Sequence, residues 1–137
     1  MRVLVVDDER TSLLIMRMFV ELLGGEALIF SDPEAALADA SHTTFDIAVL
    51  DVHMPKLNGI ELAERLRQRA PGLPIIITSI DDSRAVRRAA LQAGASDYIT
   101  KPIDRQEFVA RISRILGETG GESRSADGEQ GAPAEID

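Results

Sequence analysis

The sequence predicts an α/β fold of the doubly wound type, in which helices cover both faces of one parallel sheet. Five short apolar runs alternate with five longer segments that have the periodicity of amphipathic helices. Three of the runs are almost continuous valine, isoleucine and leucine, as in strands that are buried on both sides. Charged side chains directly follow several runs, at the edge of the sheet where doubly wound proteins bind ligands.

The expected elements are bounded by recognisable start signals. The expected strands span residues 3–6, 27–30, 47–50, 75–78 and 97–100. The expected helices span residues 11–23, 33–40, 59–69, 83–93 and 104–116. Asp32 before Pro33 predicts an N-cap followed by proline at the first helical position, and Asp104 with Glu107 predicts a capping box. Both aspartates therefore have a structural explanation and are left out of the candidate site.

Length and composition favour one soluble domain. A chain of 137 residues with 45% hydrophobic residues suits a single core, and no stretch reaches the roughly 18 apolar residues of a membrane span. The absence of cysteine excludes disulfides and thiolate sites. We expect a cytoplasmic protein. We also expect it to bind neither nucleic acid nor membranes, because its formal net charge of -8 would be repelled by their phosphates.

The acidic charge is concentrated at the C-terminus. Residues 117–137 contain six acids and one arginine, so the rest of the chain carries a formal charge of only -3. This segment is rich in glycine, serine and glutamate and has almost no large apolar residue, which is typical of disordered chain. We therefore expect a domain at residues 1–117 and a disordered acidic tail at residues 118–137.

Two adjacent acids, Asp7 and Asp8, follow the first apolar run. They would repel each other unless a cation neutralises them, and an oxygen-ligated divalent ion suits such a pair. Capping of the helix that begins near Thr11 is the alternative explanation. Asp51 favours the metal site, because it follows the third run and would lie at the same edge of the sheet.

Asp51 and Lys101 define the chemistry of the predicted site. A carboxylate at position 51 can act as a metal ligand and as a nucleophile toward phosphorus, forming an acyl phosphate. Lys101 follows the fifth run, where an ammonium can contact a carboxylate or a phosphoryl oxygen, and its bond to Pro102 is a candidate for the cis isomer. A hydroxyl after the fourth run could also contact a phosphoryl group, but the residues alone leave Ser79 and Thr78 nearly tied.

Four segments of the chain resemble the receiver domains of two-component response regulators. They are VLVVDDE, IAVLDVHMPKLNG, PIIITS and AGASDYITKPI. The resemblance covers about residues 2–116, with the segments in the order and at the spacing of the family. It implies a flavodoxin-like fold of five βα units with strand order 2-1-3-4-5. The separation of 22 residues from Lys101 selects Ser79 over Thr78 as the family's switch hydroxyl.

The resemblance also implies a role for each residue of the site. Asp51 would be the phosphoacceptor, Lys101 would contact the phosphoryl group, and Tyr98 would be the aromatic residue that reports the switch. The residues implied to hold Mg²⁺ or Mn²⁺ are Asp7, Asp8, Asp51 and, through its backbone carbonyl, His53. A histidine kinase or a phosphotransfer protein would supply the phosphoryl group. The chain would act as a phosphoacceptor rather than as an enzyme, apart from possible self-phosphorylation and self-dephosphorylation.

The chain departs from many receivers beside the switch hydroxyl. Ile80 stands where many relatives carry a small residue, and Asp81 and Asp82 follow it. We expect this bulkier and more acidic rim to alter the access or the lifetime of a phosphoryl group. We do not expect the side chain of His53 or of His42 to bind the metal.

The expected first helix carries apolar residues on more than one face. The set that can pack in the core consists of Ile15, Met16, Phe19, Val20 and Leu23. A second set, here named the apolar stripe, consists of Leu14, Met18 and Leu22. We expect the stripe to dock the kinase, the phosphotransfer protein or another copy of the chain, because it exceeds what the core needs. Deeper burial of the helix is the alternative.

The output of the domain is open to more than one interpretation. The main expectation is a single domain that binds a downstream protein through its fourth helix, fifth strand and fifth helix, as a monomer or a phosphorylation-dependent homodimer. The alternative is the receiver of a longer regulator, because the run TKPIDRQEF resembles receivers joined to cyclic-di-GMP phosphodiesterases. A phosphatase with an aspartyl nucleophile would need a second acid two residues after Asp51, where this chain has His53.

Overall fold

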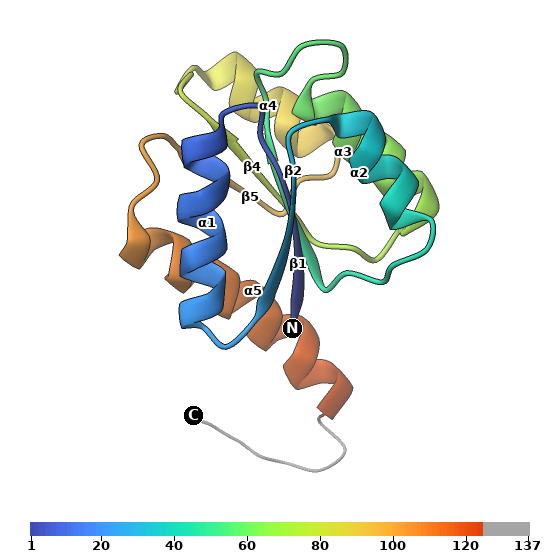
Figure 1. Ribbon diagram of the computed structural model, residues 1–137, viewed down its shortest axis with the longest axis vertical. Coiled ribbons are helices and arrows are strands. Elements are labelled where there is room, and N and C mark those ends of the chain that lie inside the picture. The colour runs from blue at the N-terminus through green and yellow to red at the C-terminus, as the bar shows by residue number, and fades with distance from the viewer. Residues whose placement is uncertain (125–137) are drawn as a thin grey trace.

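The protein folds into one parallel five-stranded sheet with helices on both faces (Figure 1). This computed structural model describes residues 1–124, with side chains as far as residue 117. The strands are β1 (Arg2–Val6), β2 (Glu26–Phe30), β3 (Ile47–Asp51), β4 (Ile75–Ser79) and β5 (Asp97–Thr100). The helices are α1 (Arg10–Leu22), α2 (Pro33–Ala40), α3 (Gly59–Arg69), α4 (Arg84–Gln92) and α5 (Arg105–Arg124). The strand order β2-β1-β3-β4-β5 confirms the order that the family resemblance implied.

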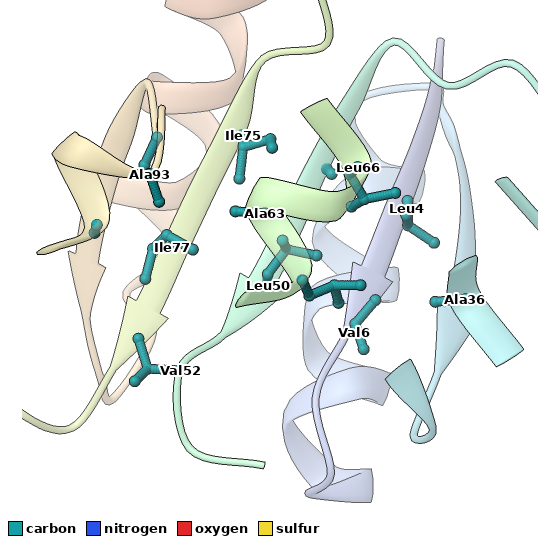
Figure 2. Close-up of a cluster of buried hydrophobic side chains, with 14 of the residues drawn as sticks. Leu4, Val6, Ala36, Leu50, Val52, Ala63, Leu66, Ile75, Ile77 and Ala93 are labelled. Atoms are coloured by element: carbon teal, nitrogen blue, oxygen red, sulfur yellow. The ribbon is translucent and has the colours of Figure 1, made fainter. Parts of the chain in front are cut away.

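Successive residues of the central strands pack into two separate cores. In β1, Leu4 and Val6 join residues of α2, α3 and α4, and Figure 2 shows Leu66 of α3 lying with them. Val3 and Val5 join residues of α1 and α5 on the other face. Every residue of β3 and β4 is buried, which explains the nearly unbroken apolar runs in the sequence. The sheet therefore has covered faces, and its strand ends are free to carry polar groups.

Both predicted helix caps form, but the capping box of Asp104 and Glu107 forms only in part. Asp32 Oδ1 accepts a hydrogen bond of 3.0 Å from the amide of Glu34, as the N-cap prediction required. Asp104 Oδ2 accepts a bond of 2.9 Å from the amide of Glu107. The reciprocal half of that capping box is replaced by an ion pair, because Glu107 Oε2 accepts a hydrogen bond of 2.9 Å from Arg111 instead.

The loop between β3 and α3 is tightly closed against the end of β3. Asn58 and Glu61 form a full capping box, which the sequence analysis did not anticipate. The amide of Gly59 donates a hydrogen bond of 3.1 Å to the carbonyl of Val52. A Cβ atom on Gly59 would lie only 2.2 Å from the backbone oxygen of Asp51, so glycine is required for this approach.

Helix α1 buries most of the predicted core face. Met16, Phe19 and Val20 are buried as predicted, and Leu23 is partly buried against the same core. The buried residues are Leu13, Met16, Phe19 and Val20. Ile15 was assigned to the core, but 36% of it is exposed, because the buried stripe of the helix runs through position 13 instead. The apolar stripe is exposed as predicted, at 37%, 50% and 64% for Leu14, Met18 and Leu22, so deeper burial of the helix is wrong.

Helix α5 is longer than the sequence predicted. It was expected to end at residue 116, but its backbone stays helical to Arg124, eight residues further. Gly117 costs about 1 kcal/mol relative to alanine, yet no proline occurs between it and Arg124, and a helix that is already nucleated can continue through such a residue. The rest of the expected tail, residues 125–137, lies outside the described residues. Among the described helices, none combines the length and the apolarity that crossing a bilayer requires.

The close approach of Gly59 to β3 generates a stability prediction. Gly59→Ala should lower the free energy of unfolding by about 1 to 3 kcal/mol, because its methyl group would push the loop away from the Asp51 carbonyl. Urea unfolding followed by circular dichroism measures the change. Gly72→Ala is the matched control, since a Cβ there meets no atom within 4 Å, and its effect should stay below about 0.5 kcal/mol. Equal effects of the two substitutions would contradict the steric argument.

Candidate functional site

Charged side chains meet where β1, β3 and β5 end. Asp7 directly follows β1, Asp51 is the last residue of β3, and Lys101 directly follows β5. Lys101 Nζ donates a hydrogen bond of 2.8 Å to Asp7 Oδ2 and lies 3.2 Å from Asp51 Oδ1. The three side chains are only 11%, 0% and 4% exposed for Lys101, Asp7 and Asp51. The fold thus joins residues up to 94 positions apart, and the Lys101–Pro102 bond is cis, the isomer that the sequence suggested.

Three carboxylates form a cluster at this edge of the sheet. Asp7, Asp8 and Asp51 each offer one oxygen, and these oxygens lie within 4.8 Å of one another. Asp7 Oδ1 accepts a hydrogen bond of 2.9 Å from the amide of Glu9, whereas exposed Asp8 makes no hydrogen bond or ion pair with any residue that the structure describes. Three carboxylates against the single Lys101 ammonium leave two negative charges. This set of oxygen donors fits a hard divalent cation.

The crowding of charge alters the acid–base properties of the site. Burial and the negative charge of Asp7 raise the pKa of Asp51 to about 6, although Lys101 acts in the opposite direction. Burial acts to lower the pKa of Lys101, but its hydrogen bond with Asp7 and the charge of Asp51 outweigh burial and raise that pKa. Lys101 is therefore a cation at neutral pH. Asp51 is ionised there at an electrostatic cost, which another cation in the cluster would reduce.

A second network joins the end of β4 to β5. Ser79 is fully buried, and its hydroxyl oxygen accepts a hydrogen bond of 2.9 Å from the amide of Asp81. The carbonyl of Asp81 accepts a hydrogen bond from the hydroxyl of Tyr98, which is only 5% exposed. One peptide segment, at Asp81, therefore connects the predicted switch hydroxyl to the predicted switch aromatic.

The two adjacent hydroxyl residues of β4 differ in their partners. Thr78 is in register with Asp51, so the two side chains leave the sheet on the same face. Thr78 Oγ1 is buried and has no hydrogen-bond partner among the described residues. Ser79 is in register with Thr100 and is bonded to the loop that leads into α4. A movement of Ser79 would therefore affect that loop directly, whereas a movement of Thr78 would not.

The rim of the site contains the residues that depart from the family pattern. Ile80 is 74% exposed and borders a hollow of about 360 Å³. The hollow is lined by Glu9, Ser12, Ile15, Ile80, Lys101, Pro102 and Ile103. Hydrogen bonds from Ser83 lower the pKa of Asp81, and the charge of His53 acts in the same direction. The exposed side chains of His53 and His42 do not belong to the carboxylate cluster.

A set of contacts beside Tyr98 could not be predicted from the sequence. Arg87 of α4 donates hydrogen bonds to Asp82 Oδ1 and to Thr100 Oγ1, and its guanidinium lies 4.7 Å from the centre of the Tyr98 ring. Asp82 and Arg87 lie on either side of the N-cap Ser83. The spacing of Asp82 and Arg87 becomes informative only when the start of α4 is known. The sequence alone therefore gave little indication of the hydrogen bond between them.

The fold and the site define a doubly wound domain with an acidic cluster and a lysine at its strand ends. A family model described as the response regulator receiver domain matches residues 3–113. The chain therefore belongs to the receiver domains of two-component response regulators.

Curated relatives and solved structures agree with this assignment. The alkaline phosphatase synthesis transcriptional regulatory protein PhoP of Bacillus subtilis is 38% identical over 115 residues, which are 84% of this chain and 48% of PhoP. The probable transcriptional regulatory protein TcrX of Mycobacterium tuberculosis is 36% identical over 118 residues, 86% of this chain and 50% of TcrX. The chain thus spans about half the length of these relatives.

Two solved receiver domains show the same architecture. The BeF3-activated DrrB receiver domain superposes with a TM-score of 0.79 at 29% identity, covering 84% of this chain and 96% of that one. A CheY-like receiver domain protein from Methanospirillum hungatei superposes with a TM-score of 0.83 at 30% identity, covering 88% and 97%. The likeness extends over nearly the whole of each known domain.

The raised pKa of Asp51 predicts a pH-dependent gain in stability from Asp51→Asn. The folded state holds the Asp51 proton more tightly than the unfolded chain does, so wild-type stability falls as pH rises from about 4 to about 6. Asn carries no such penalty. In a metal chelator at neutral pH, Asp51→Asn should raise the free energy of unfolding by about 1 to 3 kcal/mol.

Urea unfolding across the pH range measures this difference. The advantage of Asp51→Asn should shrink toward pH 4 and should also shrink when Mg²⁺ is added, because the cation would stabilise only the wild-type cluster. Asp46→Asn, at the opposite end of the sheet, is a control for loss of a carboxylate. A constant difference across the pH range would contradict the electrostatic explanation.

Proposed function

We propose that Asp51 is the phosphoacceptor of this receiver domain. The observation that carries the proposal is the buried Asp51 carboxylate, which lies 3.2 Å from the Lys101 ammonium and within one cluster with Asp7 and Asp8. A nucleophile, a cation and a set of oxygen ligands thus occupy one site. An aspartyl phosphatase is less well supported, because two residues after Asp51 the chain has His53 instead of a second acid.

In the proposed transfer, the phosphoryl group moves from a phosphohistidine nitrogen to a carboxylate oxygen of Asp51. The N–P bond breaks, an O–P bond forms, and the imidazole nitrogen keeps the electron pair of the broken bond. Asp51 needs no general base, because its pKa of about 6 leaves it ionised at neutral pH. The Lys101 ammonium can bind an oxygen of the phosphoryl group and stabilise the charge that develops there. The domain is then a stoichiometric acceptor, and any self-phosphorylation or self-dephosphorylation is secondary.

We propose that the carboxylate cluster holds Mg²⁺ or Mn²⁺. The ligands would be Asp7, Asp8, Asp51 and the backbone carbonyl of His53. When bound, the cation would offset negative charge on the transferring oxygens. The open carboxylate of Asp8 and the two uncompensated charges of the cluster support this assignment.

Phosphorylation would act on the rest of the molecule through Ser79. A phosphoryl group on Asp51 offers the Ser79 hydroxyl an anionic acceptor, and the Asp81 peptide that is bonded to Ser79 would follow its movement. The Tyr98 hydroxyl is bonded to the carbonyl of the same residue, so a phosphoryl group would favour the buried orientation of Tyr98 and thereby set the shape of the face formed by α4, β5 and α5. This face is the proposed binding surface for a downstream protein.

The partners of the domain are part of the same proposal. A histidine kinase or phosphotransfer protein would dock on the apolar stripe, which lies exposed on α1. We propose a cytoplasmic location, with no nucleic acid or membrane among the direct partners of the domain, and a monomer or a phosphorylation-dependent homodimer. Since the chain spans about half of its curated relatives, a receiver of a longer regulator is the alternative to a single-domain protein.

The phosphoacceptor assignment predicts which variants take up a phosphoryl group. With phosphoramidate and Mg²⁺, intact-mass spectrometry should show one added phosphoryl group on the wild type and none on Asp51→Asn. Ser79→Ala should still be phosphorylated but should lose the spectral changes of α4 and β5 in two-dimensional NMR with beryllofluoride. Thr78→Val is the matched control and should keep both properties, since its hydroxyl has no partner among the described residues. Stable labelling of Asp51→Asn would overturn the assignment.

The apolar stripe predicts a selective defect in transfer between proteins. With a histidine kinase that phosphorylates the wild type, Leu14→Glu and Met18→Glu should slow transfer by about tenfold or more, because charge would enter an apolar contact. Uptake from phosphoramidate should be unchanged, which separates docking from chemistry. Glu21→Gln, an exposed polar site on the same helix, serves as the control. An unchanged rate of phosphoryl transfer from the kinase in both stripe variants would contradict the docking proposal.

A further inference from the structure

Three side chains from three segments are hydrogen-bonded to one another beside Tyr98, and one of them, Arg87, lies over its ring. Arg87 donates to Asp82 Oδ1 through Nε at 2.9 Å and through a second nitrogen, and it donates to Thr100 Oγ1 at 3.2 Å. Thr100 Oγ1 itself donates to Asp82 Oδ1 at 3.2 Å. One carboxylate oxygen thus joins α4, β5 and the loop between β4 and α4. We name Asp82, Arg87 and Thr100 the arginine clamp.

The clamp and the Asp81 carbonyl hold Tyr98 from two directions. The Tyr98 hydroxyl donates to the Asp81 carbonyl, while the Arg87 guanidinium lies 4.7 Å from the ring centre, within the range of a cation–π contact. A ring fixed at its hydroxyl and at its face has little freedom to swing outward. The buried state of Tyr98, 5% exposed, is thus fastened by groups that do not touch Asp51.

Helix α4 is the element that this arrangement can control. Ala90 is its only fully buried residue, so the core holds the helix weakly. The Arg87 side chain supplies a direct tie from α4 to β5, through Thr100 and the Tyr98 ring. A change at Arg87 would therefore affect both the position of α4 and the orientation of Tyr98.

We propose that Arg87 is a positioning residue that holds Tyr98 in its buried orientation before a phosphoryl group arrives. The proposal rests on the function proposed above for Asp51, Ser79 and Tyr98. Asp82 and Thr100 orient the guanidinium, and the guanidinium holds the ring. Because Asp81 is bonded to both Ser79 and Tyr98, the clamp favours the same state that a phosphoryl group on Asp51 would favour. The binding of a phosphoryl mimic and the buried orientation of Tyr98 are thermodynamically linked. Loss of the clamp must therefore weaken binding of the mimic by the same factor by which it disfavours the buried orientation.

The chain carries its own probe for this test. Tyr98 is the only tyrosine and the chain has no tryptophan, so intrinsic tyrosine fluorescence and its quenching by acrylamide report on this ring alone. Without ligand, Arg87→Ala and Asp82→Asn should both be quenched more strongly than the wild type. Arg87→Lys should fall between them and the wild type, because lysine keeps the charge but lacks the flat, forked guanidinium.

Titration with beryllofluoride in Mg²⁺ measures the linkage. Arg87→Ala should raise the half-saturating beryllofluoride concentration about two- to fivefold, the size expected for an exposed cation–π contact. Saturating mimic should restore the low quenching of the wild type. Arg88→Ala removes an exposed arginine from the same helix and is the matched control, with no change expected in either measurement.

The outcomes separate the clamp from the phosphoacceptor assignment. If the wild type does not respond to beryllofluoride, the assignment of Asp51 as the phosphoacceptor fails. Acrylamide quenching of Tyr98 without ligand still tests the clamp in that case. If the wild type responds but Arg87→Ala matches it in quenching and in half-saturation, the clamp is overturned. Circular dichroism checks that each variant is folded. Should Arg87→Ala not fold, Arg87→Lys and Thr100→Val test the same contacts with smaller changes, and wild-type values for both would overturn the clamp as well.

Discussion

The ion pairs of Lys101 with Asp7 and Asp51 are the contacts on which the rest of the site depends. One ammonium, nearly buried, holds the ends of β1, β3 and β5 together. Removing Lys101 would cost about 3 to 5 kcal/mol, because Asp7 and Asp51 would both stay buried without a compensating charge, whereas removing Asp51 leaves Lys101 paired with Asp7. The same two aspartates also contact the starts of helices, since the Asp7 carboxylate accepts a hydrogen bond from the amide of Glu9 and the backbone carbonyl of Asp51 lies against Gly59. The acidic site and the frame of the fold are therefore built from the same residues.

The negative charge of this site is only partly compensated, and the site can therefore gain stability from a bound cation. Burial and the charge of Asp7, which the lysine only partly offsets, raise the pKa of Asp51 above that of a solvent-exposed aspartate. A better compensated site would be more stable but would gain less from a bound cation. Functional sites often carry such a local cost, which the remaining structure offsets. Here the two fully covered cores on either side of the sheet provide that stability.

Much of the fold and the heart of the site could be predicted, because both follow from local patterns repeated along the chain. Apolar runs locate the strands, and the charged residues after them converge because parallel strands end at one edge. Features that depend on tertiary packing were missed or misplaced. Ile15 has a core-like spacing, yet the buried stripe of α1 runs through a neighbouring position. Helix α5 continues to Arg124, beyond its expected end at residue 116, and Arg87 joins Asp82 and Thr100 only once α4 is in place.

The distance along the chain between the partners of the central ion pair has a consequence for the protein's synthesis. Lys101 and Asp7 are separated by 94 positions, and they meet only after β3 and β5 have joined the sheet. Contacts of this sequence separation form slowly and late, because a long loop must close first. A growing chain that still lacks β5 has its acidic residues but no ammonium beside them. In the proposed mechanism, Lys101 can therefore stabilise a phosphoryl group on Asp51 only in a domain that is complete as far as β5.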